Sequence, residues 1–425
     1  MKPRPLRALF LNDTARNGGP GRTLYCVLKY LDPAEVFRSV VVPRPGVVSE
    51  LLEQGRVVEE LRFDPLLVEN PIAPWRREMV RADYDAALPL RAIRTVGNVA
   101  RGTSCVLELA KRVRREQFDV LFCNGTTANF FGGLVAALTG VPTIWHVFYT
   151  EVAPALAPIH ARLSAREEVR AIICVSKPTA VQFANVENKV RLIHDAIDAG
   201  EYTPGGAAGV LRGELGLGSD VVVFGSQGRI LRRKGYVEMV HAAEATLRLL
   251  TAEEQTRCRF VVLGDTPADM KEDHLAECRA LVRERRLESF VHFLGYRPDV
   301  RPYVVDFDVA VVPSVYPDPL PRSVMEAMAI AKPVLAFDVG GIGEMVEDGV
   351  SGALVRGAPP DVEGMAQACV AYVRDPERRK RQGAAARATI ERDYDARAHS
   401  RLILEELAKA TAWRRGSSTA GAERR

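Results

Sequence analysis

Short apolar runs recur along the chain, and each one is followed by a polar or glycine-rich turn and then by a stretch with the spacing of an amphipathic helix. Residues 6–11, 119–124 and 308–313 are clear examples of such runs. Runs that are apolar on both faces are typical of parallel strands covered by helices on both sides. The pattern therefore predicts an α/β fold in which strands and helices alternate.

The alternation forms two series, and a stretch rich in Gly and Pro at 199–209 separates them. A chain of 425 residues is also too long for one ordinary core. We expect a first domain over 1–198, a linker over 199–209 and a second domain over 210–396, each with a doubly wound sheet. A helix over 397–413 follows, and the polar, small and charged residues 414–425 predict a disordered tail.

The stretch 313–354 concentrates the features of a ligand site. An apolar strand runs into a Pro-rich loop, Ser323 is placed to cap the helix that follows, and a second strand ends at Gly340 and Gly341. In α/β proteins, ligands bind beyond the carboxyl ends of strands and against helix N-termini. We therefore expect a binding cleft here, which a helix starting at 341–347 would also face.

Two carboxylates in this stretch, Asp318 in the loop and Glu326 on the helix, are eight residues apart. A step of that length from loop to helix lets both point into one cleft, where a carboxylate accepts two hydrogen bonds from vicinal hydroxyls such as those of a ribose. An exposed loop acid beside a solvated helix acid is the alternative interpretation.

An earlier loop carries Arg229 and Lys234, five residues apart, between Gly228 and Gly235. The glycines let the backbone come close to a ligand, and the two cations suit a pyrophosphate. An ordinary basic loop before a helix fits the spacing alone equally well.

Two positions in the first half of the chain also predict ligand contact. A glycine turn at 17–21 follows the first strand, and bare amides there would approach an anion; a sharp strand-to-helix connection without a ligand is the alternative. His146 stands at the carboxyl end of a later strand, where α/β domains place ligands. For His146, a histidine that is satisfied within the core is the alternative.

The chain resembles the retaining GT4 glycosyltransferases of GT-B fold from Asp318 on, where it reads DPLPRSVMEAMA, and in the later segments KPVLA, VGGIGE and DGVSG. The family motif is a glutamate, seven residues and a second glutamate, so Asp318 departs from it and Glu326 matches. His194 is a second departure, because the family usually carries Asn-Gly-Val-Asp at 194–198, where only Asp198 matches. The resemblance implies two Rossmann-like doubly wound domains facing a central cleft, with the last helix crossing back to the first domain.

The same resemblance implies roles for individual residues. Arg229 and Lys234 would hold the leaving nucleoside diphosphate and Glu326 its ribose, while Asp318 and His146 would lie against the donor sugar. Arg229, Lys234, His146 and Asp318 would carry the catalysis. Further contacts are implied to the donor at Gly18, Gly19, Tyr296, Arg297, Leu320, Pro321, Arg322 and Ser323, and to the acceptor at Arg16, Arg22 and Asn124.

We expect an enzyme that moves a sugar, with retention, from a nucleotide-diphosphate-sugar donor, UDP favoured, to a hydroxyl of a glycan, a glycolipid or a metabolite. Positive charge from the protein would do the work of a metal, so we expect no metal and no cofactor. Two alternatives stay open. One is a nucleotide-sugar epimerase of GT-B fold, and the other is a non-catalytic donor-binding protein, motivated by the departures at Asp318 and His194.

The net charge of +4 suits anionic small molecules or an anionic membrane surface, but it does not indicate nucleic-acid binding. The seven cysteines show no CxxC spacing, which is typical of reduced thiols. Neither a membrane-spanning run nor a signal-peptide pattern is present, so we expect a cytoplasmic protein.

Residues 76–116 carry ten Arg or Lys side chains against five acidic ones. A solvated helix face is the usual meaning of such a run, and a contact surface for the acceptor or for anionic lipid at the inner membrane face is the alternative. Asp306 and Asp308 have the spacing of a metal-binding DxD pair. Because they stand at the head of a buried strand, we expect them to serve helix-end and strand-entry roles instead.

Overall fold

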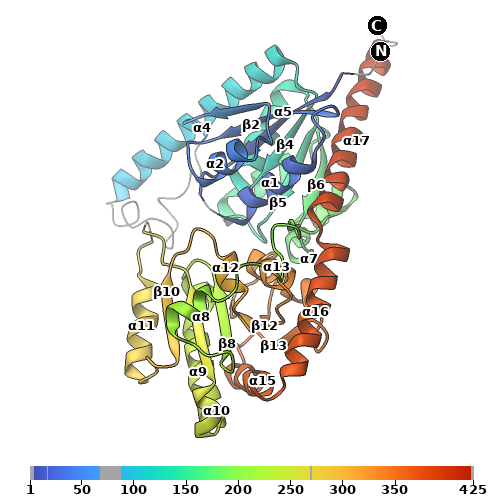
Figure 1. Cartoon of the computed structure of the whole chain (residues 1–425). Coiled ribbons are helices and arrows are strands. Elements are labelled where there is room, and N and C mark those ends of the chain that lie inside the picture. Colours follow the sequence, from blue (N-terminus) through green and yellow to red (C-terminus); the bar gives the residue numbers. More distant parts are fainter. Residues whose placement is uncertain (1–3, 17, 68–87, 269, 423–425) are drawn as a thin grey trace. The chain divides into compact units, whose positions relative to one another are not determined.

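The computed structural model describes residues 4–16, 18–67, 88–268 and 270–422, with side chains to residue 414 (Figure 1). The chain forms two compact units, one made of Met1–Ala196 with Ala396–Arg425 and the other of Ile197–Asp395. Each unit is built on its own parallel sheet, with seven strands in the first and six in the second among the described residues. The predicted α/β class with two doubly wound domains is therefore confirmed.

The sheet of the first unit has the strand order β3-β2-β1-β4-β5-β6-β7. The chain starts at β1, moves outward to β3 and then resumes on the other side of β1, so the order reverses between β1 and β4. Such a switch point leaves room for ligands at the carboxyl ends of the strands. The strands are β1 (Leu6–Asn12), β2 (Val36–Val42), β3 (Glu60–Phe63), β4 (Val120–Asn124), β5 (Thr143–Val147), β6 (Val169–Cys174) and β7 (Val190–Leu192).

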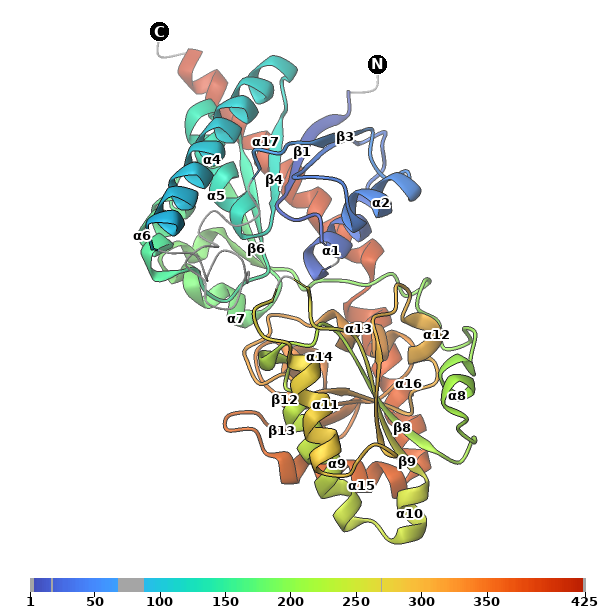
Figure 2. The ribbon, with the colours of Figure 1, turned by 90° about the vertical axis from the view of Figure 1, so that its left-hand side faces the viewer.

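Helices cover both faces of this sheet, as Figure 2 shows for α4, α5 and α6 on one side of the strands and α1 and α2 on the other. The apolar side chains of α17 join those of α1 and α2 in one core, through Ile403, Leu407 and Ala410. The helices are α1 (Gly19–Tyr30), α2 (Val47–Gln54), α4 (Leu88–Glu116), α5 (Thr126–Thr139), α6 (Ala157–Ser164), α7 (Lys177–Ala180) and α17 (Ala396–Ala422), with 3-10 turns at Pro154–Leu156 and Val181–Lys189.

The sheet of the second unit has the order β10-β9-β8-β11-β12-β13, and its switch point lies between β8 and β11. Side chains of α9, α11 and α15 pack on one face of it. The strands are β8 (Val222–Gln227), β9 (Cys258–Leu263), β10 (Val291–Gly295), β11 (Val309–Val312), β12 (Val334–Asp338) and β13 (Gly352–Arg356). The helices are α8 (Val210–Leu215), α9 (Tyr236–Leu249), α10 (Ala252–Thr256), α11 (His274–Glu284), α12 (Arg301–Val304), α13 (Arg322–Ala329), α14 (Ile342–Met345), α15 (Val362–Arg374) and α16 (Pro376–Asp393), with a 3-10 turn at Arg232–Lys234.

Two local predictions differ from the structure. Ser323 does not cap α13, because the helix already begins at Arg322 with Pro321 in the cap position and without a side-chain cap. α17 continues as helix to Ala422, where the composition predicted disorder from 414 on, and residues 423–425 lie outside the described part of the chain. In the described residues, no helix has the length and hydrophobicity needed to cross a membrane.

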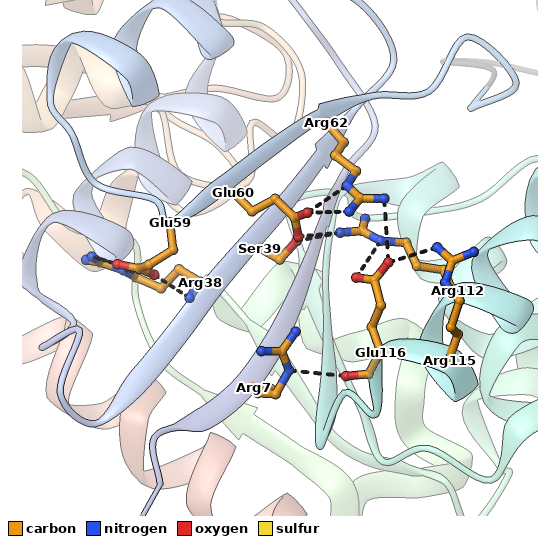
Figure 3. A network of polar contacts seen from close by, with 9 residues as sticks. All are labelled: Arg7, Arg38, Ser39, Glu59, Glu60, Arg62, Arg112, Arg115 and Glu116. Atoms are coloured by element: carbon orange, nitrogen blue, oxygen red, sulfur yellow. Dashed lines mark hydrogen bonds and ion pairs between the residues drawn. The ribbon is translucent and has the colours of Figure 1, made fainter.

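Part of the predicted basic surface at 76–116 is instead tied into a polar network (Figure 3). Arg112 of α4 is almost fully buried, and its guanidinium contacts Ser39 at 2.8 Å, Glu60 at 2.6 Å and Glu116 at 3.1 Å. Arg115 adds an exposed contact to Glu116 at 3.0 Å. Arg112 therefore joins α4 to β2 and β3, and is no part of a solvated face; residues 76–87 of the run lie outside the described residues.

The partners of Glu60 and Glu116 in this network lower the pKa of both carboxyl groups. Burial alone would raise the pKa of Glu60, but hydrogen bonds from Ser39 and Arg62 and the charge of Arg112 outweigh it and lower that pKa below its ordinary value of 4.5. A carboxyl group with a depressed folded-state pKa stabilises the protein above its unfolded-state pKa, and this stabilisation is lost as the pH falls through the folded-state value.

We predict that Arg112→Ala lowers the free energy of unfolding of the first unit by about 2–4 kcal/mol, because it removes a buried guanidinium that joins three elements and leaves the half-buried carboxylates of Glu60 and Glu116 without their partner. Arg115→Ala, which removes a contact whose Arg side chain is 71% exposed, should cost less than about 1 kcal/mol. Urea unfolding followed by tryptophan fluorescence measures this, since all three tryptophans, at 75, 145 and 413, belong to the first unit. The Arg112→Ala effect should shrink as the pH falls below the ordinary glutamate pKa of 4.5 and the carboxylates take up protons. Equal effects of the two variants would contradict the role of Arg112.

Candidate functional site

In the second unit, the loops after β8 and β11 touch at a glycine. Gly235 has a left-handed φ of 73°, and a side chain there would overlap the carbonyl oxygen of Pro313 at the end of β11. The amide of Val315 also donates to the carbonyl of Arg233 at 3.0 Å. The turn that carries Lys234 is therefore held directly against the start of the loop that carries Asp318.

Lys234 and Asp318 form an ion pair between these loops, with side chains only 20% and 8% exposed. Burial alone would lower the pKa of Lys234, but the Asp318 carboxylate outweighs it and keeps that pKa above its usual value. The ring of Tyr316 lies beside two of the three cations of the turn, 4.9 Å from the Arg233 guanidinium and 5.4 Å from the Lys234 ammonium. The structure thus holds a charged ammonium group at the carboxyl end of the sheet.

A third loop, after β12, fixes the backbone of Asp318. Gly340 has a φ of 60°, and a side chain there would overlap the carbonyl oxygen of Asp318. The same carbonyl accepts a hydrogen bond from the amide of Gly341 at 2.9 Å. Because its backbone is held on this side, the Asp318 carboxylate extends toward Lys234.

Glu326 lies on α13 and is buried at the end of the neighbouring strand β8. Its carboxylate accepts hydrogen bonds from Gln227 at 3.1 Å and from the hydroxyl of Tyr202 at 3.3 Å, and the Arg322 guanidinium lies 3.8 Å away. Gln227 could have been found from its position as the last residue of a strand before a glycine, whereas no local signal pointed to Tyr202 in the predicted linker. The two predicted acids thus share one strand edge, each with its own polar partners.

The remaining predicted residues of this unit take different positions. Arg229 lies exposed in the turn after β8, and Tyr296 is 54% exposed. The Arg297 side chain is used within the fold, where it donates to the Tyr303 hydroxyl at 2.9 Å and to Glu214 at 2.6 Å. Leu320 and Pro321 are buried, and Arg322 and Ser323 form the first turn of α13.

Asp306 and Asp308 both have structural partners. Asp306 accepts hydrogen bonds from the amides of Gly209, Leu211 and Arg212 and thereby caps the start of α8. Asp308 accepts from the amide of Val223 at 2.9 Å and pairs with Arg212 at 2.7 Å. Within the described residues, no three His, Cys, Asp or Glu side chains are grouped so as to hold a metal ion.

In the first unit, three polar side chains stand side by side at the ends of adjacent strands. Asn12, Asn124 and His146 are partners in the register of β1, β4 and β5, and all three are fully buried. The Asn124 amide nitrogen donates to Asn12 Oδ1 at 2.7 Å and to the carbonyl of Pro20 at 2.9 Å, while Asn124 Oδ1 lies 3.1 Å from His146 Nδ1. The glycine turn is therefore tied to His146 through Asn124. The sequence interpretation missed Asn12, although it ends an apolar strand just as Asn124 does.

The predicted glycine turn begins α1. Gly18 is the cap residue with extended backbone and open space around its α-carbon, so no steric reason demands glycine there. Gly21 is the constrained one, because a side chain would overlap Val48 of α2. Arg16 is exposed and Arg22 half-buried at this turn.

The departure at His194 belongs to a structural cluster of the first unit. The carbonyl of His194 accepts a hydrogen bond from His399 Nδ1 of α17 at 2.8 Å. The next residue, Asp195, is buried and accepts from the Thr23 hydroxyl of α1 at 2.7 Å. This segment thus fastens α1 and α17 to the sheet. Asp198, in the second unit, accepts from the amide of Gly200 at 2.9 Å.

Two family models match adjacent parts of the chain. Residues 17–201 match the model for "Glycosyltransferase Family 4", and residues 220–375 match the model for "Glycosyl transferases group 1". The chain belongs to the GT4-type group 1 glycosyltransferases. Both matches include the parts of the two units just described, the Asn124–His146 strand ends and the Lys234–Asp318 pair.

Among curated relatives, the chain is 35% identical over 206 residues to the α-maltose-1-phosphate synthase of Mycobacterium tuberculosis (strain ATCC 25618 / H37Rv), a match that covers 47% of the chain and 51% of the relative. The chain thus spans about half the length of such relatives. It is 28% identical over 368 residues to the α-D-kanosaminyltransferase of Streptomyces kanamyceticus, covering 79% of the chain and 90% of the relative.

Solved structures show the fold of this glycosyltransferase. Anabaena HepE, solved in complex with UDP and glucose, superposes with a TM-score of 0.74 at 20% identity, over 95% of this chain and 100% of that one. The sucrose-phosphate synthase of Thermosynechococcus elongatus gives 0.69 at 18% identity, over 96% and 99%. The fold is GT-B, as the sequence predicted.

We predict that Gly340→Ala lowers the free energy of unfolding of the second unit by at least about 3 kcal/mol, since it adds a clash with the Asp318 carbonyl to the strain of a left-handed residue. Gly349→Ala is the matched control, because Gly349 has a φ of 76° but open space around it, and should cost only about 1–2 kcal/mol. Hydrogen exchange in urea, read from peptides of Ile197–Asp395, measures both. Similar costs would show that the contact of Gly340 with Asp318 contributes nothing.

Proposed function

We propose that this glycosyltransferase moves a sugar, with retention, from a nucleotide-diphosphate-sugar, UDP favoured, to a hydroxyl of a glycan, a glycolipid or a metabolite. The observation that carries the proposal is the charged, nearly buried Lys234 ammonium group at the carboxyl end of the second sheet. Family membership supports it, and so does the UDP and glucose bound to HepE, a protein of the same fold.

Lys234, with Arg229 in the same turn, supplies the positive charge that a departing diphosphate needs. As the bond between the sugar carbon and the phosphate oxygen breaks, negative charge grows on the diphosphate and positive charge on the sugar. A fixed cation in a site with little water stabilises that separation without reorganising. The acceptor oxygen then bonds to the sugar carbon, and its proton leaves with the diphosphate. On this proposal the reaction needs no metal, because protein cations neutralise the leaving group.

Asp318 serves this chemistry in two ways in our proposal. It is the counter-ion of Lys234 before the donor binds, and its carboxylate then faces the donor sugar. Glu326, held by Gln227 and Tyr202, binds the ribose. The other donor contacts are proposed at Gly18, Gly19, His146, Tyr296, Arg297, Leu320, Pro321, Arg322 and Ser323.

The acceptor side is proposed in the first unit, with Arg16 and Arg22 as contacts and with Asn124 acting indirectly, through the orientation of His146. We also propose that the start of α4 contacts an anionic membrane. Within the described part of the basic run, Ile93 and Val96 are exposed there beside Arg91 and Arg94. Co-sedimentation with anionic vesicles at low and high salt tests it, and binding that salt does not weaken would contradict it.

The experiment that tests the proposed function follows the products from a panel of nucleotide sugars, with and without cell-derived acceptors and with and without EDTA. We expect acceptor-dependent release of nucleoside diphosphate, a product with the anomeric configuration of the donor, and activity that survives EDTA. Conversion of the donor without an acceptor would instead identify an epimerase, and donor binding without turnover a binding protein. Loss in EDTA that magnesium restores would contradict the metal-free mechanism.

We predict that Lys234→Ala lowers kcat/KM by roughly 30- to 1000-fold, that is about 2–4 kcal/mol, because the leaving group loses its buried cation. Arg232→Ala is the matched control, since Arg232 belongs to the same turn but is exposed and pairs with Glu238 at 2.8 Å. It should stay within about threefold of the parent. Steady-state kinetics measures both, and equal losses would reduce the role of Lys234 to general surface charge.

A further inference from the structure

Backbone carbonyls fix which atoms donate and which accept in the row Asn12, Asn124 and His146 at the strand ends of the first unit. Asn12 Nδ2 donates to the carbonyl of Thr14 at 2.6 Å, and a carbonyl only accepts, so the Asn12 oxygen must face Asn124. Asn124 Nδ2 donates both to that oxygen and to the carbonyl of Pro20. Turning either amide over would set oxygen against oxygen, so the orientation of both is fixed.

This direction decides which nitrogen of His146 carries the proton. Asn124 Oδ1 is an acceptor and lies 3.1 Å from His146 Nδ1, so Nδ1 must be the donor. Burial, and then the neighbouring His399 ring, lowers the pKa of His146 well below its usual value, so the ring is neutral at pH 7. Its Nε2 therefore carries a lone pair and accepts hydrogen bonds.

No donor among the described residues reaches that lone pair. His146 Nε2 is buried without a hydrogen-bond partner in this part of the chain. The nearest polar ring, His399, has its centroid 6.0 Å away and uses Nδ1 to donate to the carbonyl of His194. Burial lowers the pKa of His399 as well, so its own Nε2 is also an acceptor, and two acceptors do not bond to each other. The other rings beside His146 are those of Phe122 and Phe148.

We propose that Asn12 and Asn124 are positioning residues, which fix His146 in the Nδ1–H tautomer so that Nε2 is ready to accept a hydrogen bond from a substrate hydroxyl. The use of this acceptor by a sugar rests on the proposed function, whereas the tautomer does not. Asn124 acts through His146 and has no free hydrogen-bonding atom for the acceptor, since its oxygen and both amide hydrogens are engaged within the unit. The Nε2 lone pair accepts a hydrogen bond from a hydroxyl group and repels an anion, which brings only lone pairs of its own, so this position favours hydroxyl groups over anions.

Two-bond ¹H–¹⁵N NMR of the full chain, labelled at its seven histidines, reads the tautomer directly. The His146 signal is assigned by its loss in His146→Gln, and spectra are taken at pH 8, where the ring is neutral. We expect Nδ1–H in the parent protein. Asn124→Leu, which removes the acceptor, should bring up the Nε2–H form, while Asn124→Asp, which keeps an acceptor, should retain Nδ1–H.

Asn129→Leu is the matched control, because Asn129 is equally buried but donates only to the backbone carbonyl of His146, at 3.3 Å, and to the Tyr149 hydroxyl. It should leave the tautomer unchanged. Thermal unfolding confirms that each variant is folded. An Nε2–H form in the parent protein, or a tautomer that Asn124→Leu does not change, would overturn the proposal.

Steady-state kinetics tests whether the tautomer of His146 affects sugar transfer. We expect Asn124→Leu to lower kcat/KM by roughly tenfold or more. Asn124→Asp restores the acceptor for His146 but sets its second oxygen against Asn12 and Pro20, so it should recover part of that loss, a rescue that a purely structural role would not give. The two failures are distinguishable. The expected tautomer without any transfer would contradict the proposed function alone, whereas transfer that is indifferent to a changed tautomer would contradict this inference alone.

Discussion

The candidate site of the second unit depends on keeping one ammonium group charged in a place with little water. An isolated charge there would lose its proton or unfold the loop, so Lys234 needs Asp318 within contact distance. Holding the two together requires three loops that follow β8, β11 and β12, and two of the contacts exist only because Gly235 and Gly340 lack side chains. The ion pair explains why these loops carry glycine at those two contacts.

In the first unit, the buried polar groups at the carboxyl ends of the strands are neutral instead. Asn12, Asn124 and His146 are as buried as Asp318, yet each is hydrogen-bonded to an amide or a carbonyl and none needs a counter-ion, although Nε2 of His146 has no partner among the described residues. A row of neutral hydrogen-bonded groups fixes the orientation of each side chain, because each donor must face an acceptor. An ion pair instead places a strong electric field at the site. The two units thus offer different chemistry, one suited to phosphate charge and the other to hydroxyl groups.

Much of the fold follows from the sequence, because parallel strands that are buried on both faces appear as apolar runs, as in β4 and β11. The spacing of Arg229, Lys234, Asp318 and Glu326 likewise located the loops of the candidate site. Contacts between segments far apart in the sequence could not be predicted. Nothing local showed that Tyr202 would meet Glu326, that Arg112 would be buried against β2 and β3, or that Asn12 would orient Asn124. The Ser323 cap failed because the proline before the helix already sets its start.

The first unit is assembled from both ends of the chain. Ile403, Leu407 and Ala410 of α17 complete a core whose other members come from β1, β2 and their neighbouring helices. During synthesis these early strands and helices leave the ribosome long before their last apolar partners exist. An apolar strip of the emerging unit therefore stays uncovered until residues 403–410 have been made, and a ribosome that stalls before them would leave that strip exposed to other proteins.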